Sequence, residues 1–157
     1  METRLFTRRV LVALFASASL FFAGCDKDDD DDDEMFKISG NASGAQEVPP
    51  VTTSATGTLT GTYDRNTNML QYTISWTGLS GNVSVAHFHG PALAGVSANP
   101  VIDIEITTNG TSGSVTGTAT LTEELEDDLL AGRIYYNFHT VLHPAGEIRG
   151  QVEADDD

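Results

Sequence analysis

The four histidines of this chain lie in two short segments and are its best candidates for chemistry. His87 and His89 are two residues apart, while His139 and His143 follow much later in the chain. On a β-strand, residues i and i+2 project to the same face with their Cα atoms about 7 Å apart. His87 and His89 are therefore predicted to point the same way. Two such imidazoles form half of a zinc or copper site, and His139 would supply a third nitrogen from a neighbouring strand.

A structural role for the same histidines is the alternative. An imidazole that hydrogen-bonds a backbone carbonyl or a carboxylate anchors a loop without any metal. His143 precedes Pro144 and is predicted to be an exposed loop residue. The sequence leaves both interpretations of His87, His89 and His139 open.

The acidic residues provide no recognisable catalytic pair. Glu147 and Arg149 would share one face of a strand and form a local ion pair, worth about 0–1 kcal/mol if exposed. Asp103 and Glu105 alternate with isoleucines and are predicted to face solvent. The chain has no Gly-x-Ser-x-Gly elbow, phosphate-binding loop or His-Glu-x-x-His motif. We therefore expect no catalytic residues and no enzyme activity.

The elements that position these residues are predicted to be β-strands, because apolar residues alternate with polar ones. Leu70, Tyr72, Ile74 and Trp76 are predicted to line one face of a strand. Trp76, Phe88 and Phe138 are predicted to belong to the core. Residues 64–68 have the composition of a hairpin turn. Seven or eight strands are expected, and the clearest cover residues 58–63, 69–76, 83–89, 102–106, 114–121, 134–139 and 148–153.

One segment has a helical pattern instead. Thr122 is suited to cap a helix, acidic residues fill its first turn, and Gly132 would end it. Leu125, Leu129 and Leu130 are predicted to pack inward. Many short strands with one short helix predict an all-β sandwich or barrel, and they exclude a doubly wound α/β fold.

The N-terminus is typical of a secreted, lipid-anchored protein. Residues 1–24 contain three arginines and then a 14-residue apolar stretch, which is too short to span about 30 Å of hydrocarbon. Small residues before the single cysteine resemble the bacterial lipoprotein signal, which implies that Cys25 becomes the lipidated N-terminus. The acidic residues 25–34 are predicted to be a disordered tether. The folded domain is predicted at residues 35–154, followed by a solvated acidic tail at 155–157.

The charge of the chain limits its partners. It has 8 Lys and Arg residues against 23 Asp and Glu residues, a net charge of −15. A chain without clustered basic residues is not expected to bind nucleic acid. The single cysteine also excludes an internal disulfide.

Five short motifs follow one another in order across residues 35–154. They contain Gln46, Glu47, Pro49, Pro50, His87, His89, Gly90, Pro91, Asn137, His139, Thr140, Gly146, Glu147, Arg149 and Gly150. Together these motifs resemble the CHRD (chordin) domain. The resemblance implies an immunoglobulin-like fold that is distantly similar to copper/zinc superoxide dismutase. In chordin, domains of this type belong to an extracellular protein that sequesters growth factors.

The dismutase likeness has limits. The pair His87 and His89, and a later His139 after the segment 132–134, are similar to the dismutase copper ligands. However, residues 91–100 contain no metal ligand, and the chain lacks a bridging histidine and a disulfide pair. The resemblance therefore implies at most a single copper or zinc ion.

Two functions follow. The first is a CHRD module that is anchored to the bacterial cell envelope through Cys25, at the outer membrane and the cell surface. It would bind a protein or a glycan through loops 46–51 and 90–99, or serve a structural role, without a cofactor. Pro91, Leu93 and Val96 would be apolar contacts of the second loop or would pack against the domain. The alternative function is mononuclear copper or zinc binding by His87, His89 and His139, with redox chemistry as an extension of it.

Overall fold

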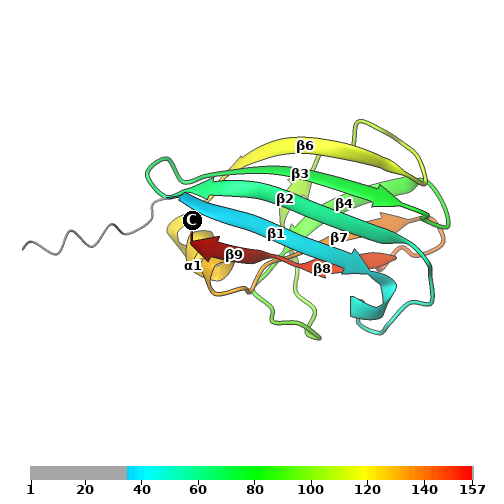
Figure 1. The fold of residues 1–157 in the computed structure, drawn as a ribbon. Coiled ribbons are helices and arrows are strands. Elements are labelled where there is room, and N and C mark those ends of the chain that lie inside the picture. The colour runs from blue at the N-terminus through cyan, green and yellow to red at the C-terminus, as the bar shows by residue number, and fades with distance from the viewer. Residues whose placement is uncertain (1–34, 157) are drawn as a thin grey trace, which may run out of the picture. The chain divides into compact units, whose positions relative to one another are not determined.

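The computed structural model describes residues 35–156, which form an antiparallel β-structure with one short α-helix (Figure 1). The strands are β1 (Met35–Ser43), β2 (Thr56–Asp64), β3 (Met69–Thr77), β4 (Val83–His89), β5 (Pro100–Ile104), β6 (Gly113–Thr120), β7 (Tyr135–Thr140), β8 (Ile148–Gln151) and β9 (Glu153–Asp156). A 3-10 turn, η1 (Gly44–Gln46), follows β1, and the helix α1 (Glu123–Leu130) precedes β7. The predicted signal peptide (1–24), Cys25 and the acidic tether (25–34) lie outside the described residues, as does Asp157. Across residues 35–156, no helix has the length and apolarity needed to cross a bilayer.

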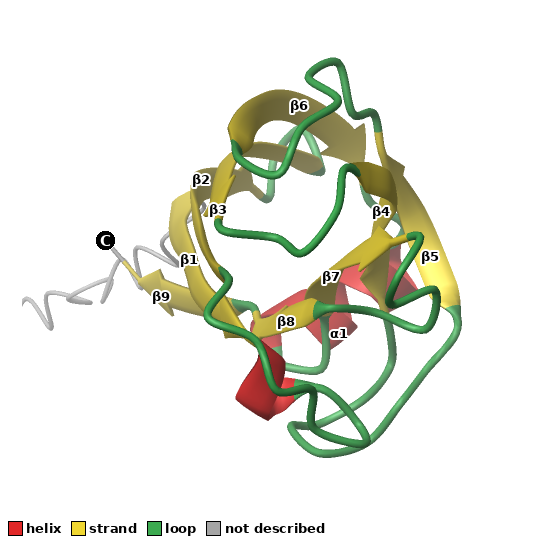
Figure 2. Cartoon of the chain, turned by 90° about the vertical axis from the view of Figure 1, so that its right-hand side faces the viewer, coloured by secondary structure: helices red, strands yellow, loops and turns green. Residues whose placement is uncertain are grey.

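The strands form one sheet that curls into a barrel. Their order is β5-β4-β7-β8-β1-β2-β3-β6, and β9 also pairs with β1. Every pairing described is antiparallel. The view along the strands shows how the sheet encloses a central core, with β5 and β6 at its two ends (Figure 2). The predicted all-β fold with one short helix is confirmed.

The core consists of the inward-facing residues of the predicted alternating strands. On β3, Leu70, Tyr72, Ile74 and Trp76 are buried, while the residues between them are exposed. Phe88 of β4 and Phe138 of β7 are fully buried, and the rings of Trp76 and Phe138 lie 5.0 Å apart. The predicted core positions of Trp76, Phe88 and Phe138 are therefore confirmed.

β7 differs from the prediction, because both of its faces are buried. Ile134, Tyr136 and Phe138 point into the barrel as expected, but all residues of β7 are buried, including those that the alternation places outside. The loop 90–99 covers this outer face: the backbone N–H of Ala92 donates to the Arg133 carbonyl, and Tyr135 contacts Ala98. A strand pattern alone does not reveal a loop that covers the outside of a sheet.

The two ends of the domain also contain more strand than predicted. β1 has no counterpart among the clearest predicted strands, and the predicted strand 148–153 is divided at Val152 into β8 and β9. Asp155 is exposed as predicted for the tail, but its backbone belongs to β9 and pairs opposite Lys37 of β1. Pairing with β1 therefore extends the ordered domain two residues beyond position 154.

The helix α1 agrees with its prediction. The Thr122 side chain caps it by accepting a hydrogen bond from the backbone N–H of Leu125. Leu129 is buried and Leu125 and Leu130 pack against the core. Gly132 follows the helix with a φ of 65°, a left-handed conformation that favours glycine.

Candidate metal centre

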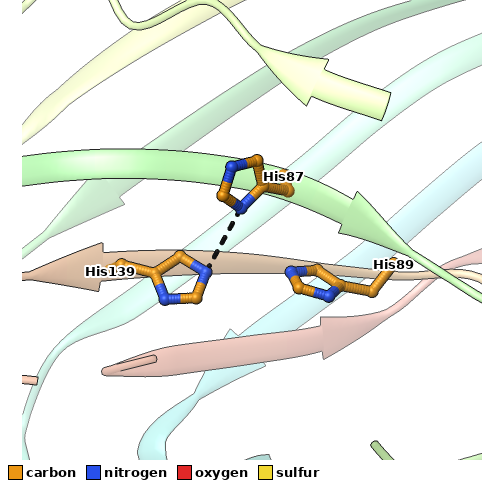
Figure 3. A group of neighbouring side chains, drawn as sticks. All are labelled: His87, His89 and His139. Carbon is orange, nitrogen blue, oxygen red and sulfur yellow. Dashed lines mark hydrogen bonds between the residues drawn. The ribbon is translucent and has the colours of Figure 1, made fainter. Parts of the chain in front are cut away.

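The three predicted metal-ligating histidines come together on the outer face of β4 and β7. These strands are antiparallel neighbours, with His89 opposite Tyr135, His87 opposite Asn137, and Val85 opposite His139. His87 and His89 project from β4 toward His139 of β7 (Figure 3). One ring nitrogen from each histidine lies within 4.8 Å of the others. The predicted convergence of His87, His89 and His139 is thus present in the structure.

Backbone carbonyls hold the Nδ1 of two rings, so the Nε2 of each is turned toward the other histidines, where His139 Nε2 lies in hydrogen-bond contact with His87 Nδ1. His89 Nδ1 lies 3.0 Å from the carbonyl oxygen of Ala98, and His139 Nδ1 lies 3.0 Å from that of Pro144. A carbonyl only accepts, so each Nδ1 carries the proton and each Nε2 presents a lone pair. His89 Nε2 is buried without a hydrogen-bond partner among the described residues.

The nitrogen positions fit a small metal ion. Two nitrogens on one zinc, each about 2.0–2.1 Å from it, lie about 3.3–3.6 Å apart. His87 Nδ1 and His139 Nε2 are already 3.4 Å apart. Ligating imidazoles commonly donate their second N–H to a backbone carbonyl, which fixes the ring and the tautomer. His89 and His139 both have this arrangement, so the donor set and its support suit zinc or copper.

Burial favours the neutral form of His89 and His139, which is the form that a metal requires. The pKa of His89 is lowered mainly by burial, despite its bond to Ala98, and the pKa of His139 is lowered for the same reason. His87 is the most accessible of the three, and its Nε2 lies 3.7 Å from Asp103 Oδ1. Asp103 is exposed, as predicted. Solvent therefore reaches the site from the His87 side.

Comparison with known proteins identifies the family. A family model described as "CHRD domain" matches residues 38–152, which is more than half of the chain. The chain belongs to the CHRD domain family. Searches of curated proteins and of solved structures returned no match. The likeness to copper/zinc superoxide dismutase therefore stays a prediction.

The predicted ion pair between Glu147 and Arg149 of this CHRD domain is wrong. Both residues are fully buried, and each is bound to neutral groups instead. Glu147 accepts hydrogen bonds from the hydroxyls of Ser80, Thr140 and Thr53 and from the Ser80 backbone N–H. Burial acts to raise the pKa of Glu147, but these hydrogen bonds outweigh it and lower the pKa below its ordinary value.

Arg149 holds the loop 90–99 onto the CHRD barrel. Its guanidinium donates to the carbonyls of Val96 and Leu93, at 2.8 and 3.2 Å, and to the side chain of Gln151. It also lies over the ring of Tyr135, with Cζ 3.5 Å from the ring centroid. Charges two residues apart predict a shared exposed face, but the loop 90–99 covers Arg149. Glu147 is instead enclosed by Thr53, Ser80 and Thr140.

Glu47 and Asn137 form a buried polar pair of the CHRD domain, beside the histidines. Asn137 lies opposite His87 in the sheet, and its amide donates to Glu47 Oε2 at 3.3 Å. Burial raises the pKa of Glu47 to about 7, against the opposing effects of the Arg149 charge and the Asn137 bond. Glu47 Oε1 and Asn137 Oδ1 have no hydrogen-bond partner among the described residues. Gly146 leaves room for this pair, because a Cβ there would lie 2.5 Å from Asn137 Oδ1.

The two predicted recognition loops of the CHRD domain lie side by side. Residues 45–48, Pro50 and residues 94–95 line a cavity of about 430 Å³, together with Arg149 and Gln151. Pro91, Leu93 and Val96 are exposed, so they do not pack inward. His143 is half-buried in the turn after β7, rather than exposed as predicted, and its ring is not part of the histidine group.

Sequence reasoning did not identify the groups that orient the histidines. The Ala98 and Pro144 carbonyls are backbone atoms in loops, and residue type gives no signal for them. Tyr135 was expected only as a residue of an alternating strand, yet its ring stacks on that of His89.

Proposed function

We propose that this CHRD domain binds a single copper or zinc ion between His87, His89 and His139. The supporting observation is the buried Nε2 of His89, which has no partner among residues 35–156 and faces two other imidazoles. Leaving a buried polar atom unpaired costs about 1–3 kcal/mol. A metal ion would satisfy this nitrogen and would replace the hydrogen bond between His87 Nδ1 and His139 Nε2.

The residues around the site determine how the ligands are oriented and from which side solvent reaches the ion. His89 and His139 are oriented by backbone carbonyls, while His87 lies at the solvent side. Three nitrogen ligands leave a coordination position for an outside molecule. Bound copper would supply one-electron redox chemistry, and bound zinc would polarise a water. The described residues support the binding of the ion.

Metal titration of single variants tests this proposal. We expect Cu²⁺ or Zn²⁺ to bind the full-length protein with a stoichiometry of one. Histidine-to-alanine variants at positions 87, 89 and 139 should each weaken binding by at least tenfold. His143→Ala is the matched control, because His143 lies outside the group, and it should bind like the wild type. Wild-type affinity in all three ligand variants, or no binding by the wild type, would contradict the proposal.

We also propose that the domain is held at the cell envelope by a lipid on Cys25, at the outer membrane and facing the cell surface. The supporting features are the arginines and apolar stretch of residues 1–24, the small residues before Cys25, and the acidic spacer after it. Labelling with a fatty-acid analogue should mark the wild type but not Cys25→Ala, and the variant should leave the membrane fraction. Finding unacylated wild-type protein free in the medium would contradict the anchor.

A second candidate function is the binding of an envelope protein or glycan by the two loops. It is favoured by the shared cavity and by exposed Leu93 and Val96, which are 61% and 55% accessible. Affinity capture from an envelope extract should recover a partner that Leu93→Ser with Val96→Ser loses. Val141→Ser, which changes an exposed valine of another loop, is the control. Recovery of the same background proteins with every variant would argue against this function.

The net charge of −15 does not favour nucleic acid as a partner.

A further inference from the structure

Tyr135 is the residue that most directly fixes the orientation of a candidate ligand. Its ring stacks on the His89 ring with a centroid distance of 4.8 Å and an interplanar angle of 8°. Its hydroxyl donates to the Ala98 carbonyl at 3.2 Å, and this carbonyl also accepts from His89 Nδ1. The Ala98 backbone N–H in turn lies 3.2 Å from the Tyr135 oxygen. Tyr135 therefore contacts both the face of the His89 ring and the group that accepts its hydrogen bond.

Tyr135 is itself held from the opposite side. Strand β7 lies between β4 and β8, so His89 and Arg149 approach Tyr135 from different neighbours in the sheet. The Arg149 guanidinium lies over the Tyr135 ring and also holds the loop that carries Ala98, through the carbonyls of Leu93 and Val96. His89, Tyr135 and Arg149 thus form a row across three strands, and the loop 90–99 is hydrogen-bonded to all three side chains.

We propose that Tyr135 is the positioning residue of the histidine site. It holds His89 in the tautomer with the proton on Nδ1, so that Nε2 faces His87 and His139. The effect on metal affinity rests on the proposed metal function. The effect on the His89 ring does not, because it is a property of the metal-free protein.

Two substitutions of Tyr135 separate its contributions. Tyr135→Phe keeps the ring stack and removes the hydroxyl bonds to Ala98, whereas Tyr135→Leu removes both. The matched control is Tyr136→Phe. It also removes a tyrosine hydroxyl bond, from Tyr136 to the Gly40 carbonyl, but on the core side of the same strand.

The first measurement is the tautomer of His89 in the metal-free, full-length chain. Nitrogen chemical shifts of ¹⁵N-histidine-labelled protein at pH 8 report which ring nitrogen carries the proton, and His89→Gln identifies the resonances. We expect mainly the Nδ1–H form in the wild type and in Tyr136→Phe. Tyr135→Phe should show a partial shift toward the Nε2–H form, and Tyr135→Leu a larger one. A wild-type tautomer in both Tyr135 variants would overturn the proposal.

The second measurement is the affinity for Zn²⁺ and Cu²⁺ by competition with a chromophoric chelator. Loss of a group that orients a ligand weakens metal binding by about 10–100-fold, and we expect this loss in Tyr135→Leu. Tyr135→Phe should lose less, and Tyr136→Phe should stay within about twofold of the wild type. Equal affinity in Tyr135→Leu and the wild type would overturn the proposed role. If the wild type binds neither metal, the proposed metal function fails, and the tautomer measurement alone decides the role of Tyr135. If Tyr135→Leu does not fold, the more conservative Tyr135→Phe gives the decision.

Discussion

At the residue scale, Glu147 and Arg149 show how buried charges are compensated without a direct ion pair. Glu147 is surrounded by hydroxyl and N–H donors, and Arg149 by backbone carbonyls and an aromatic ring. Burying an ionised group is expensive unless hydrogen bonds replace its hydration. Both residues meet this requirement with neutral partners. Glu47, in contrast, has one carboxylate oxygen without a partner among the described residues, and its pKa is raised instead.

Glu47 gives a prediction for the pH dependence of stability. Its pKa is about 7 in the folded domain, against an ordinary value of 4.5. Because the pKa of Glu47 is higher in the folded than in the unfolded chain, ionisation of Glu47 opposes folding. The free energy of unfolding therefore decreases as the pH rises from about 4.5 to about 7. The shift corresponds to about 3 kcal/mol. We therefore compare the free energy of unfolding of Glu47→Gln with that of the wild type at each pH. This difference should be more favourable to Glu47→Gln at pH 8 than at pH 4, by up to this amount.

Denaturant unfolding of both proteins at a series of pH values measures this difference. Other groups titrate alike in the two proteins, so their effects cancel in the comparison. Glu153→Gln is the control, because Glu153 is exposed and its substitution should give no such trend. A difference between Glu47→Gln and the wild type that stays constant with pH would refute the prediction.

At the element scale, strict alternation makes some strands predictable and others not. The inward positions of β3 hold large apolar residues, so this strand is evident from the sequence. On β1, two of the four inward positions are Gly40 and Ala42, which weakens the pattern. The structure explains Gly40, because a Cβ there would lie 2.6 Å from the Gln151 carbonyl oxygen. Where two strands approach closely, a small residue replaces a large apolar one, and the alternation that identifies a strand in the sequence is lost.

The candidate site was predictable to a similar extent. Spacing alone predicts that His87 and His89 point together, and the antiparallel pairing of β4 with β7 brings in His139. The covering loop 90–99 was not predictable, because it is held by backbone carbonyls and by Arg149. A contact between a side chain and a distant carbonyl depends on the tertiary fold and leaves no periodic pattern in the sequence.

The contact between β3 and β7 through Trp76 carries a prediction at this scale. Trp76 packs against Phe138 across the core, and its Nε1 donates to the Gly110 carbonyl at 3.2 Å. Trp76→Ala should lower the free energy of unfolding by about 3–5 kcal/mol, since it leaves a large cavity. Urea unfolding followed by circular dichroism measures this, because Trp76 is the only tryptophan and its fluorescence is lost. Trp76→Phe keeps an aromatic ring there and should lose less. Equal losses in the two variants would show that packing is not the main contribution.

At the scale of the whole domain, the histidine site joins elements that are distant in the sequence. His87 and His89 belong to β4 and His139 to β7, and the carbonyls that orient them come from the two loops following these strands. A metal ion bound to all three side chains would be held by the folded chain and not by the unfolded one. Its binding free energy would then add to the stability of the whole domain.

Thermal unfolding with added metal tests this coupling. A ligand present at 100 times its Kd stabilises the folded state by about 2.7 kcal/mol, which corresponds to a rise in Tm of about 10 °C for a domain of this size. We expect such a rise with Zn²⁺ and none with Mg²⁺, which prefers oxygen ligands. The combined substitution of His87, His89 and His139 by alanine should abolish the zinc effect, whereas His143→Ala should preserve it. An equal rise in the triple variant would assign the stabilisation to other ligands, such as the many carboxylates of the chain. Zinc bound to the three imidazoles cannot stabilise a variant that lacks all three of them.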